Sequence, residues 1–406
     1  MNTDFYRIKR LPPYIFEEVN RIKARLRAEG TDIIDFGMGN PDMPTPQPII
    51  DKLIETVQKP RTTRYSASKG IPGLRKAMAH YYAQRFGVKL DPDREVIATL
   101  GSKEGFANLA QAITAPGDVV ICPNPAYPIH AYGFIMAGGV IQHVPALSPE
   151  QYLSGISTAV QESSKPPLAV IVSYPSNPQA QWVDLDFYKE VIRLAKKHDL
   201  IVLSDVAYSE IYFDNNPPPS ILQVEGAKDV AVEINSLSKT YAMAGWRVGM
   251  VVGNERLCAA LARVKSYLDY GAFTPIQVAA ASALNGPQDC VDDIRAIYKS
   301  RRDTLISAMA QAGWNIPAPP ASMFAWAPLP EQFKDAGSML FAKLLIEEAG
   351  VAVAPGVGFG EYGEGYVRVG LVENEHRIRQ AARNVRKFLS NADEILARAH
   401  NKEPAL

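Results

Sequence analysis

"SLSKTYAMAGWRVGM" (residues 236–250) sets one lysine among groups that bind anions. Lys239 follows two serines, Ser236 and Ser238, and Arg247 lies eight positions further on. An isolated lysine usually lies on the surface, because ammonium groups are almost never fully buried unless a specific partner holds them. Two hydroxyls and a guanidinium so close in sequence therefore point to a binding site, and to a fold that can enclose it.

A repeating order of apolar runs and helical patterns surrounds this stretch. The apolar runs occupy 95–100, 118–123, 168–175, 200–205, 229–236 and 247–253, and the clearest helical pattern occupies 185–198. Near-continuous Val/Ile runs that alternate with helices indicate strands buried on both faces. The order predicts an α/β fold, with a mostly parallel sheet sandwiched by helices and a proline-broken loop after 118–123. Ligands of such sheets bind beyond the carboxyl ends of the strands.

The regular alternation of apolar runs and helical patterns ends after "NGP" (285–287). A long helical pattern at 288–312 leads to two strand-like runs and a helix; these three segments are 321–329, 365–372 and 374–391. We expect a large α/β domain at 46–286 and a smaller, discontinuous α+β domain from 1–45, which includes an N-terminal arm, and 287–406.

Three polar residues follow three of the apolar runs. Asn177, Asp205 and Lys239 occur in this order, with gaps of 28 (177 to 205) and 34 (205 to 239) residues. Asn-Pro is a common turn and an Asp often caps a helix, so each residue alone has an ordinary structural explanation. The ordered set is more specific, because it brings three chemical groups to one edge of the predicted sheet.

This set resembles a known family, the fold-type I pyridoxal-phosphate enzymes, and among them the class I/II aminotransferases. The likeness covers nearly the whole chain and rests on "YPSNP" (174–178), "SDVAYSE" (204–210) and Ser-x-Ser-Lys followed by Gly-x-Arg-x-Gly (236–249). Stretches such as "DIIDFGMGNPD", "GSKEG" and "NPAYPIH" resemble bacterial glutamate–pyruvate (alanine) aminotransferases in particular. The resemblance implies pyridoxal 5'-phosphate as cofactor.

The resemblance also implies catalytic roles. Lys239 would bind the cofactor aldehyde and later act as a base, which requires that its charge be suppressed. Asp205 would face the ring nitrogen, because a carboxylate keeps that nitrogen protonated and the ring able to accept electrons. Tyr208 and Asn177 would contact the phenolic oxygen of the ring.

The cofactor phosphate needs hydrogen-bond donors. Gly101 and Ser102 lie between a predicted strand and helix, where free backbone N–H groups and the helix dipole favour an anion. Ser236 and Ser238 add hydroxyls, and Arg247 adds a planar guanidinium suited to phosphate. We therefore expect the serines and the arginine to hold the phosphate.

Further residues are assigned by the resemblance. Tyr127 would stack on the cofactor ring, and Tyr65 would reach the phosphate of a neighbouring subunit, which implies a homodimer with shared active sites. Arg368 would bind the substrate α-carboxylate through a bidentate contact, and Asn177 would also reach this carboxylate. Gly39, with the adjacent Asn40, would belong to a loop that closes over the substrate. Lys103 is a candidate for the cofactor site and for a distal substrate carboxylate.

The implied reaction moves an amino group between an L-amino acid and a 2-oxo acid by ping-pong kinetics, with alanine and 2-oxoglutarate as the expected pair. Aspartate, diaminopimelate, methionine and branched-chain substrates remain open. Other reactions of the same fold, such as β-elimination of sulfur by a C–S lyase, would share Lys239, Asp205 and Arg247.

Composition limits the other possibilities. Balanced charge, 43 basic against 43 acidic residues, gives no global attraction for nucleic acid or anionic lipid. Three widely spaced cysteines fit no disulfide framework, and the absence of a signal-like or bilayer-spanning apolar run agrees with a cytoplasmic protein. The six histidines show no metal-ligand spacing, so no metal is predicted and each histidine is expected on the surface or in a loop.

"GFGEYG" (358–363) precedes a strand pattern rather than a helix, so we interpret it as a loop and not as a dinucleotide site.

Overall fold

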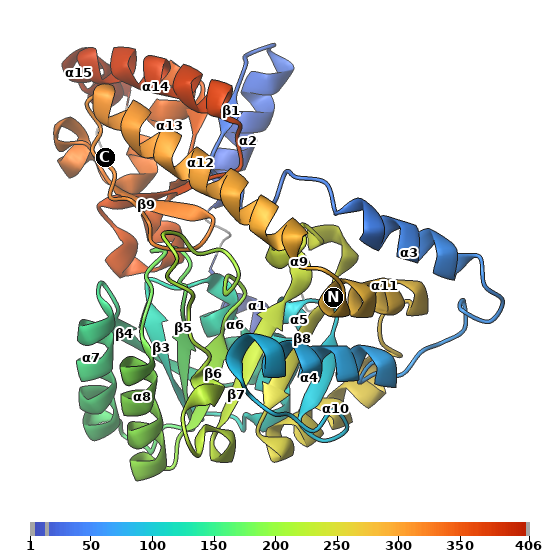
Figure 1. Ribbon diagram of the computed structural model, residues 1–406. Coiled ribbons are helices and arrows are strands. Elements are labelled where there is room, and N and C mark those ends of the chain that lie inside the picture. Colours follow the sequence, from blue (N-terminus) through green and yellow to red (C-terminus); the bar gives the residue numbers. More distant parts are fainter. Residues whose placement is uncertain (1–4, 13–15, 403–406) are drawn as a thin grey trace.

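The computed structural model describes residues 5–12 and 16–402. Within them, a seven-stranded sheet has the order β2-β8-β7-β6-β5-β3-β4 and occupies the lower half of Figure 1. Strands β7, β6, β5, β3 and β4 are parallel, whereas β8 is antiparallel to both of its neighbours. The mostly parallel α/β fold is thus confirmed. The strands are β2 (Val96–Thr99), β3 (Val119–Asn124), β4 (Val140–Pro145), β5 (Ala169–Ser173), β6 (Ile201–Asp205), β7 (Ala231–Ser236) and β8 (Gly249–Gly253).

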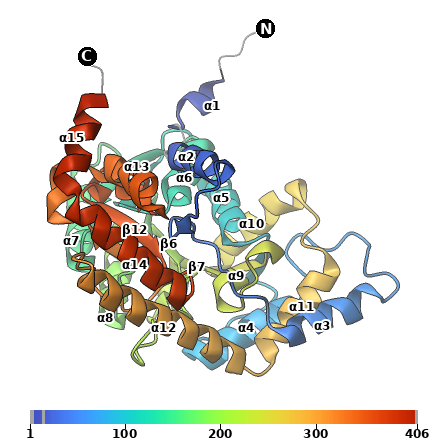
Figure 2. The ribbon, with the colours of Figure 1, turned by 90° about the horizontal axis from the view of Figure 1, so that it is seen from above.

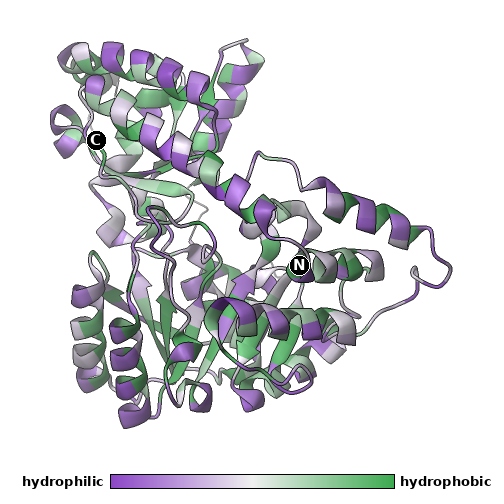
Figure 3. Cartoon of the chain, viewed as in Figure 1, coloured by the Kyte–Doolittle hydropathy of each residue, from purple (hydrophilic) through white to green (hydrophobic). Residues whose placement is uncertain are grey.

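Helices cover both faces of this sheet, because its strands are apolar on both sides. Val170 packs in the same buried cluster as α4, α7, α8 and α11, while its neighbour Ile171 packs with α5, α6 and α10. Figure 3 shows the resulting apolar strands between helices with polar outer faces. The helices of this part are α3 (Gln47–Val57), α4 (Pro72–Phe86), α5 (Ser102–Ile113), α6 (Pro128–Ala137), α7 (Pro149–Glu162), α8 (Leu185–His198), α9 (Leu237–Thr240), α10 (Glu255–Leu268) and α11 (Thr274–Asn285). Short 3-10 turns occur at η1 (Ile221–Gln223), η2 (Ala227–Asp229) and η3 (Ala244–Trp246).

Two elements of this part differ from the sequence analysis. The predicted proline-broken loop contains α6, because Pro128 occupies the first turn, where its missing N–H has no intrahelical partner to lose. The edge strand β4 was not predicted. Its residues are mostly half-buried or exposed, so they lack the continuous apolar run of a central strand.

A second assembly lies above the large sheet in Figure 1. It holds an antiparallel sheet, β11-β12-β9, and a parallel pair, β1-β10. Figure 2 shows α12 and α14 side by side. Its elements are α2 (Phe16–Ala28), β1 (Ile34–Asp35), α12 (Asp289–Gln311), β9 (Phe324–Pro328), α13 (Ser338–Ala349), β10 (Val351–Ala352), β11 (Ala354–Pro355), β12 (Tyr366–Gly370), α14 (Glu375–Ser390) and α15 (Ala392–Lys402), with 3-10 turns η4 (Glu331–Ala336), η5 (Gly356–Phe359) and η6 (Glu361–Gly363). The short helix α1 (Tyr6–Lys9) is not part of it, since Arg10, directly after α1, donates to the carbonyl oxygens of Ile135 and Gly139 in the large-sheet part. The predicted loop at 358–363 therefore contains two 3-10 turns.

The start of the chain packs with its end. Val19, Ile34 and Phe36 belong to the same buried cluster as α12, α13 and α14, and β1 pairs with β10. These contacts support the discontinuous smaller domain, whose boundaries stay a prediction. No helix among the described residues is long and apolar enough to cross a bilayer.

Candidate active site

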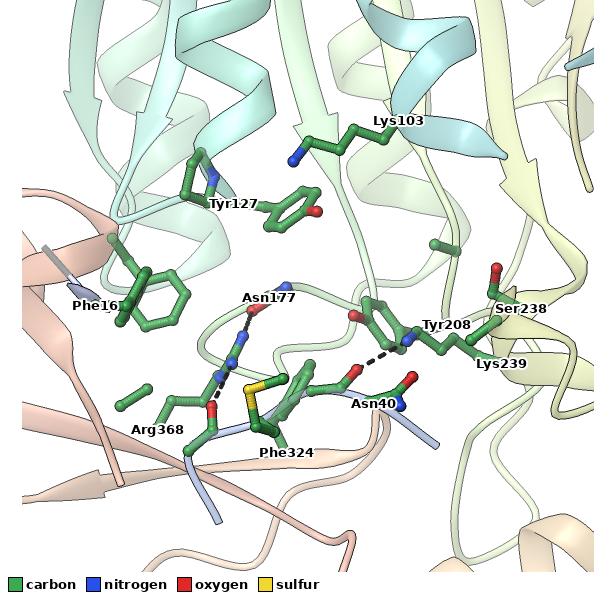
Figure 4. A pocket seen from close by; sticks show the side chains of 18 of the residues that line it. Phe16, Asn40, Lys103, Tyr127, Asn177, Tyr208, Ser238, Lys239, Phe324 and Arg368 are labelled. Atoms are coloured by element: carbon green, nitrogen blue, oxygen red, sulfur yellow. Dashed lines mark hydrogen bonds between the residues drawn. The ribbon is translucent and has the colours of Figure 1, made fainter. Parts of the chain in front are cut away.

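A cavity of about 620 Å³ lies between the large sheet and the second assembly (Figure 4). Ser173, Asp205 and Ser236, the last residues of β5, β6 and β7, line one side of it, and Phe324 and Arg368 line the other. The cavity brings together most of the predicted site residues, namely Gly39, Ser102, Lys103, Tyr127, Asn177, Asp205, Tyr208, Ser236, Ser238, Lys239, Arg247 and Arg368. Gly101 adjoins this lining, and Tyr65 lies outside it.

Lys239 lies on the one-turn helix α9, directly after β7. The hydroxyl of Ser236 accepts a hydrogen bond from the Ser238 backbone N–H (3.1 Å) and so begins this turn. Lys239 Nζ donates to the carbonyl oxygen of Gly39 (2.9 Å). Burial, with the nearby positive charges of Arg368 and Arg247, lowers the Lys239 pKa from 10.5 to about 8. The amine is still mostly protonated near neutral pH, but its neutral, nucleophilic form is far more populated than that of an ordinary lysine.

Asp205 is the last residue of β6, and its carboxylate has a hydrogen-bond partner that the sequence analysis did not predict. His130, on the first turn of α6, is fully buried, and its Nε2 donates to Asp205 Oδ2 (2.8 Å). The other oxygen of Asp205 accepts from the Ala207 N–H (3.1 Å). The expectation that every histidine lies on the surface or in a loop is thus wrong for His130. The local sequence offered no signal for this contact, because Tyr127, the neighbouring residue that was singled out, precedes α6 and does not share a helix face with His130.

Arg368 is held in place from several directions. Its Nη1 donates to Asn177 Oδ1 (2.8 Å) and its Nη2 to the Gly37 carbonyl oxygen (3.2 Å). The rings of Phe324 and Phe359 lie 4.1 and 4.7 Å from the guanidinium carbon. This side chain is presented by β12, and Figure 4 shows its hydrogen bond to Asn177.

Tyr208 contacts Phe324 edge-on, with ring centroids 5.6 Å apart. Burial raises the pKa of its hydroxyl above the ordinary value, so the hydroxyl is neutral over the physiological pH range. Tyr127 precedes α6 and makes an edge-on contact with His130 (5.9 Å). Lys103 Nζ lies 6.0 Å from the centre of the Tyr127 ring.

The site fits the pyridoxal phosphate that the resemblance implies. Arg247 Nη2 donates to the Leu100 carbonyl oxygen (3.3 Å), beside Gly101 at the start of α5. A Cβ at Gly101 would lie 2.0 Å from Arg247 Nη2, so only glycine allows the guanidinium this close to the turn. A guanidinium at a helix N-terminus suits a phosphate dianion. A lysine of low pKa and a buried carboxylate in the same cavity suit an aldehyde and a protonated ring nitrogen.

Several cavity residues were not singled out in the sequence. Phe16, Lys23 and Asp35 come from the N-terminal part of the chain, and Phe324 and Phe359 flank Arg368. Their residue types are ordinary, and although Asp35 and Phe359 lie within quoted stretches, nothing in the local sequence indicates that these five side chains line one cavity. Among the described residues, no group of three or more His, Cys, Asp or Glu side chains has the arrangement of a metal site.

Comparisons with known proteins agree with this geometry. The family model for aminotransferase class I and II matches residues 31–385. The putative aminotransferase AatC of Rhizobium meliloti is 66% identical over 97% of both chains. The glutamate-pyruvate aminotransferase AlaC of Escherichia coli is 50% identical, over 97% of this chain and 95% of its own.

Other relatives are also similar. The LL-diaminopimelate aminotransferase of Moorella thermoacetica is 40% identical, over 95% of this chain and 98% of its own. The substrate-bound structure of BacF from Bacillus subtilis superposes with a TM-score of 0.90 at 32% identity, over 96% of this chain and 98% of its own. The chain belongs to the class I and II aminotransferases and is a pyridoxal-phosphate-dependent enzyme of fold type I.

Proposed function

We propose that this aminotransferase exchanges the amino group between alanine and 2-oxoglutarate, giving pyruvate and glutamate. The observation that carries the proposal is the likeness to the Escherichia coli glutamate-pyruvate enzyme over almost the whole chain. The cavity agrees with it, because it holds Arg368 for an α-carboxylate and a further cation, Lys103, for a distal one.

Each predicted residue has a place in this scheme. When bound, pyridoxal phosphate supplies an aldehyde for the substrate amine and a ring that withdraws electrons from the substrate α-carbon. Lys239 would hold the aldehyde of the cofactor and would serve as the base that moves the proton from the substrate α-carbon. Asp205, oriented by His130, would face the ring nitrogen, and Arg368 with Asn177 would fix the α-carboxylate.

The remaining residues position the cofactor. Tyr127 would stack on its ring, and the Tyr208 hydroxyl would donate to its phenolic oxygen. Gly101, Ser102, Ser236, Ser238 and Arg247 would hold its phosphate, and Gly39 would close over the substrate.

A homodimer with shared active sites belongs to the same proposal. Tyr65 is 85% exposed in the single chain and lies 4.6 Å from Tyr270, ring centre to ring centre. Tyr267, Leu268 and Phe273 are exposed nearby in sequence, so this region carries an apolar surface that a second subunit would cover. Tyr65 would then reach the phosphate of the partner.

A second candidate substrate is LL-diaminopimelate, favoured by the relatives of that name. That substrate carries a distal ammonium group as well as a distal carboxylate. The described carboxylates that line the cavity, Asp35 and Asp205, already contact Lys23 and His130. This arrangement favours the smaller alanine and glutamate.

The test is a panel of amino donors assayed with 2-oxoglutarate and with pyruvate. We expect alanine with 2-oxoglutarate to give the highest kcat/KM and to yield glutamate and pyruvate in equal amounts. A higher kcat/KM for diaminopimelate or aspartate would overturn the alanine proposal. Release of pyruvate and ammonia from a sulfur-containing substrate, with no transfer to an acceptor, would indicate a C–S lyase instead.

A further inference from the structure

The segment from Asp35 to Asn40 forms one wall of the cavity. It contacts two positively charged side chains of the site, Lys239 and Arg368. The carbonyl oxygen of Gly37 accepts from Arg368 Nη2 (3.2 Å), and that of Gly39 accepts from Lys239 Nζ (2.9 Å). The fit is close, since a Cβ on Gly39 would lie 2.9 Å from the Phe324 ring. The position of this segment therefore decides the surroundings of the two residues on which substrate binding and proton transfer depend.

Backbone pairing supports only the beginning of the segment. The ladder between β1 and β10 ends at Asp35. Phe36 adds two further backbone bonds, because its N–H donates to the Ala352 carbonyl oxygen (2.9 Å) and its carbonyl oxygen accepts from the Gly370 N–H (2.7 Å). Beyond that point the Asp35 side chain continues the support, because its Oδ1 accepts from the Gly37 N–H (3.1 Å). Asp35 thus links a fixed strand to the carbonyl that touches Arg368.

Lys23 fixes the Asp35 carboxylate from the neighbouring helix α2. Its Nζ lies 2.8 Å from Asp35 Oδ2, and only 10% of its side chain is exposed. Arg27 also contacts Asp35 Oδ2, at 3.3 Å, but 53% of its side chain is exposed. Exposed ion pairs are screened by water and contribute little, whereas breaking a buried pair leaves an uncompensated charge. Of the two cations, Lys23 is therefore the one that orients Asp35.

We propose that Lys23 and Asp35 are positioning residues for amino-acid recognition. Their buried ion pair holds the Gly37 and Gly39 carbonyls against Arg368 and Lys239 and so keeps both cations oriented toward the substrate. The proposal rests on the proposed function in one respect, namely that Arg368 binds the substrate α-carboxylate. It predicts a loss of substrate affinity that is common to all amino donors, because every donor carries that carboxylate.

The test compares Lys23→Met with its matched control, Arg27→Met, since both remove a cation from the same carboxylate oxygen. For Lys23→Met we expect the KM for alanine and for glutamate to rise roughly tenfold, while kcat changes less, because a hydrogen bond to a charged group is lost. Hydrogen–deuterium exchange of the peptide that spans residues 36–41, measured on the cofactor-free protein, should be faster by a similar factor. Arg27→Met should match the wild type in both measurements.

Two further variants protect the test against a misfolded protein. Lys23→Arg keeps the charge and should restore KM and exchange, whereas Asp35→Asn keeps an acceptor for Gly37 but removes the ion pair and should reproduce the defect. The proposal is overturned if Lys23→Met and Asp35→Asn leave KM and exchange unchanged, if they lower only the melting temperature, or if Arg27→Met is equally impaired. The exchange measurement needs no substrate, so a wild type that failed to transaminate would overturn the proposed function and not the anchoring of this segment.

Discussion

The two sides of the cavity are built in different ways. On the sheet side, Asp205 and Ser236 end β6 and β7, and Lys239 follows three residues later, so adjacent parallel strands place the groups for the cofactor. On the opposite side, the groups near the substrate come from α2 and the nearby Asp35–Asn40 segment and, more than 300 residues later in the sequence, from β12. The reaction chemistry is thus positioned by local connections, whereas substrate recognition depends on long-range packing.

The largest effect expected is on the sheet side. Lys239→Ala should lower kcat by at least about 10⁴-fold, because it removes both the amine that binds the aldehyde and the base that moves the proton. Steady-state kinetics with alanine and 2-oxoglutarate would measure this, with circular dichroism as a control for folding. Turnover at the wild-type rate would contradict the role of Lys239.

Asp205→Ala should lower kcat by about 10²- to 10³-fold and weaken cofactor binding, because the charge beside the ring nitrogen is lost. Cofactor affinity can be measured by absorbance titration, independently of turnover. If kcat and cofactor affinity both matched the wild type, the Asp205 carboxylate would not stabilise the charge on the ring nitrogen.

Arg368→Lys tests the opposite side. We expect KM to rise about 10- to 100-fold for every amino acid, with a smaller change in kcat, because a point charge replaces a two-pronged guanidinium. Steady-state kinetics with alanine, glutamate and aspartate would measure it. A fall in kcat with constant KM would contradict the role of Arg368 in substrate binding and would place it with the residues that carry out the reaction.

The low pKa of Lys239 predicts a change in stability with pH in the cofactor-free protein. Below pH 8 the amine is protonated in both states, and folding carries the full cost of burying its charge. Between pH 8 and 10.5 the unfolded chain binds more protons, so wild-type stability gains from this group as pH rises. Lys239→Met should therefore have a free energy of unfolding higher than that of the wild type by up to about 3 kcal/mol at pH 7. At pH 10 this difference should be smaller. Urea unfolding at both pH values would measure the difference, and equal stability at pH 7 would refute the burial cost.

The smallest effect concerns His130, which acts only through Asp205. His130→Phe should lower kcat about two- to tenfold, since one hydrogen bond to the carboxylate is lost while the carboxylate itself remains. His130→Asn, which can still donate, should recover part of the loss. If His130→Phe lowered kcat as much as Asp205→Ala does, His130 would be as important as the carboxylate itself and would not act only by orienting it.

The same contrast explains how far the sequence could be interpreted. The strand ends that carry Asn177, Asp205 and Lys239 could be predicted, because buried parallel strands have a plain apolar signature and their carboxyl ends converge. The edge strand β4 could not, because its half-exposed residues resemble a loop. The fold class and the enzyme family are confirmed, whereas the residue roles stay predictions.

Tertiary packing accounts for what the sequence analysis missed in the site. His130 is buried because α6 packs against the sheet, and nothing in its immediate sequence shows whether that histidine faces inward. Lys23 and Asp35 meet because α2 lies beside β1, a contact that neither residue type predicts. Residues of this kind become visible only when the fold is known.

The flanking of Arg368 by two phenyl rings has a consequence for the shape of anion that it can recognise. The rings of Phe324 and Phe359 lie against the guanidinium carbon and restrict approach to it, so a ligand must meet the N–H groups at the edge. A flat carboxylate can align both oxygens with that edge, whereas the tetrahedral head of a sulfonate or phosphonate projects an oxygen toward the rings. The enzyme should therefore discriminate between carboxylic amino acids and their sulfonic or phosphonic analogues by geometry, even where the charge is the same.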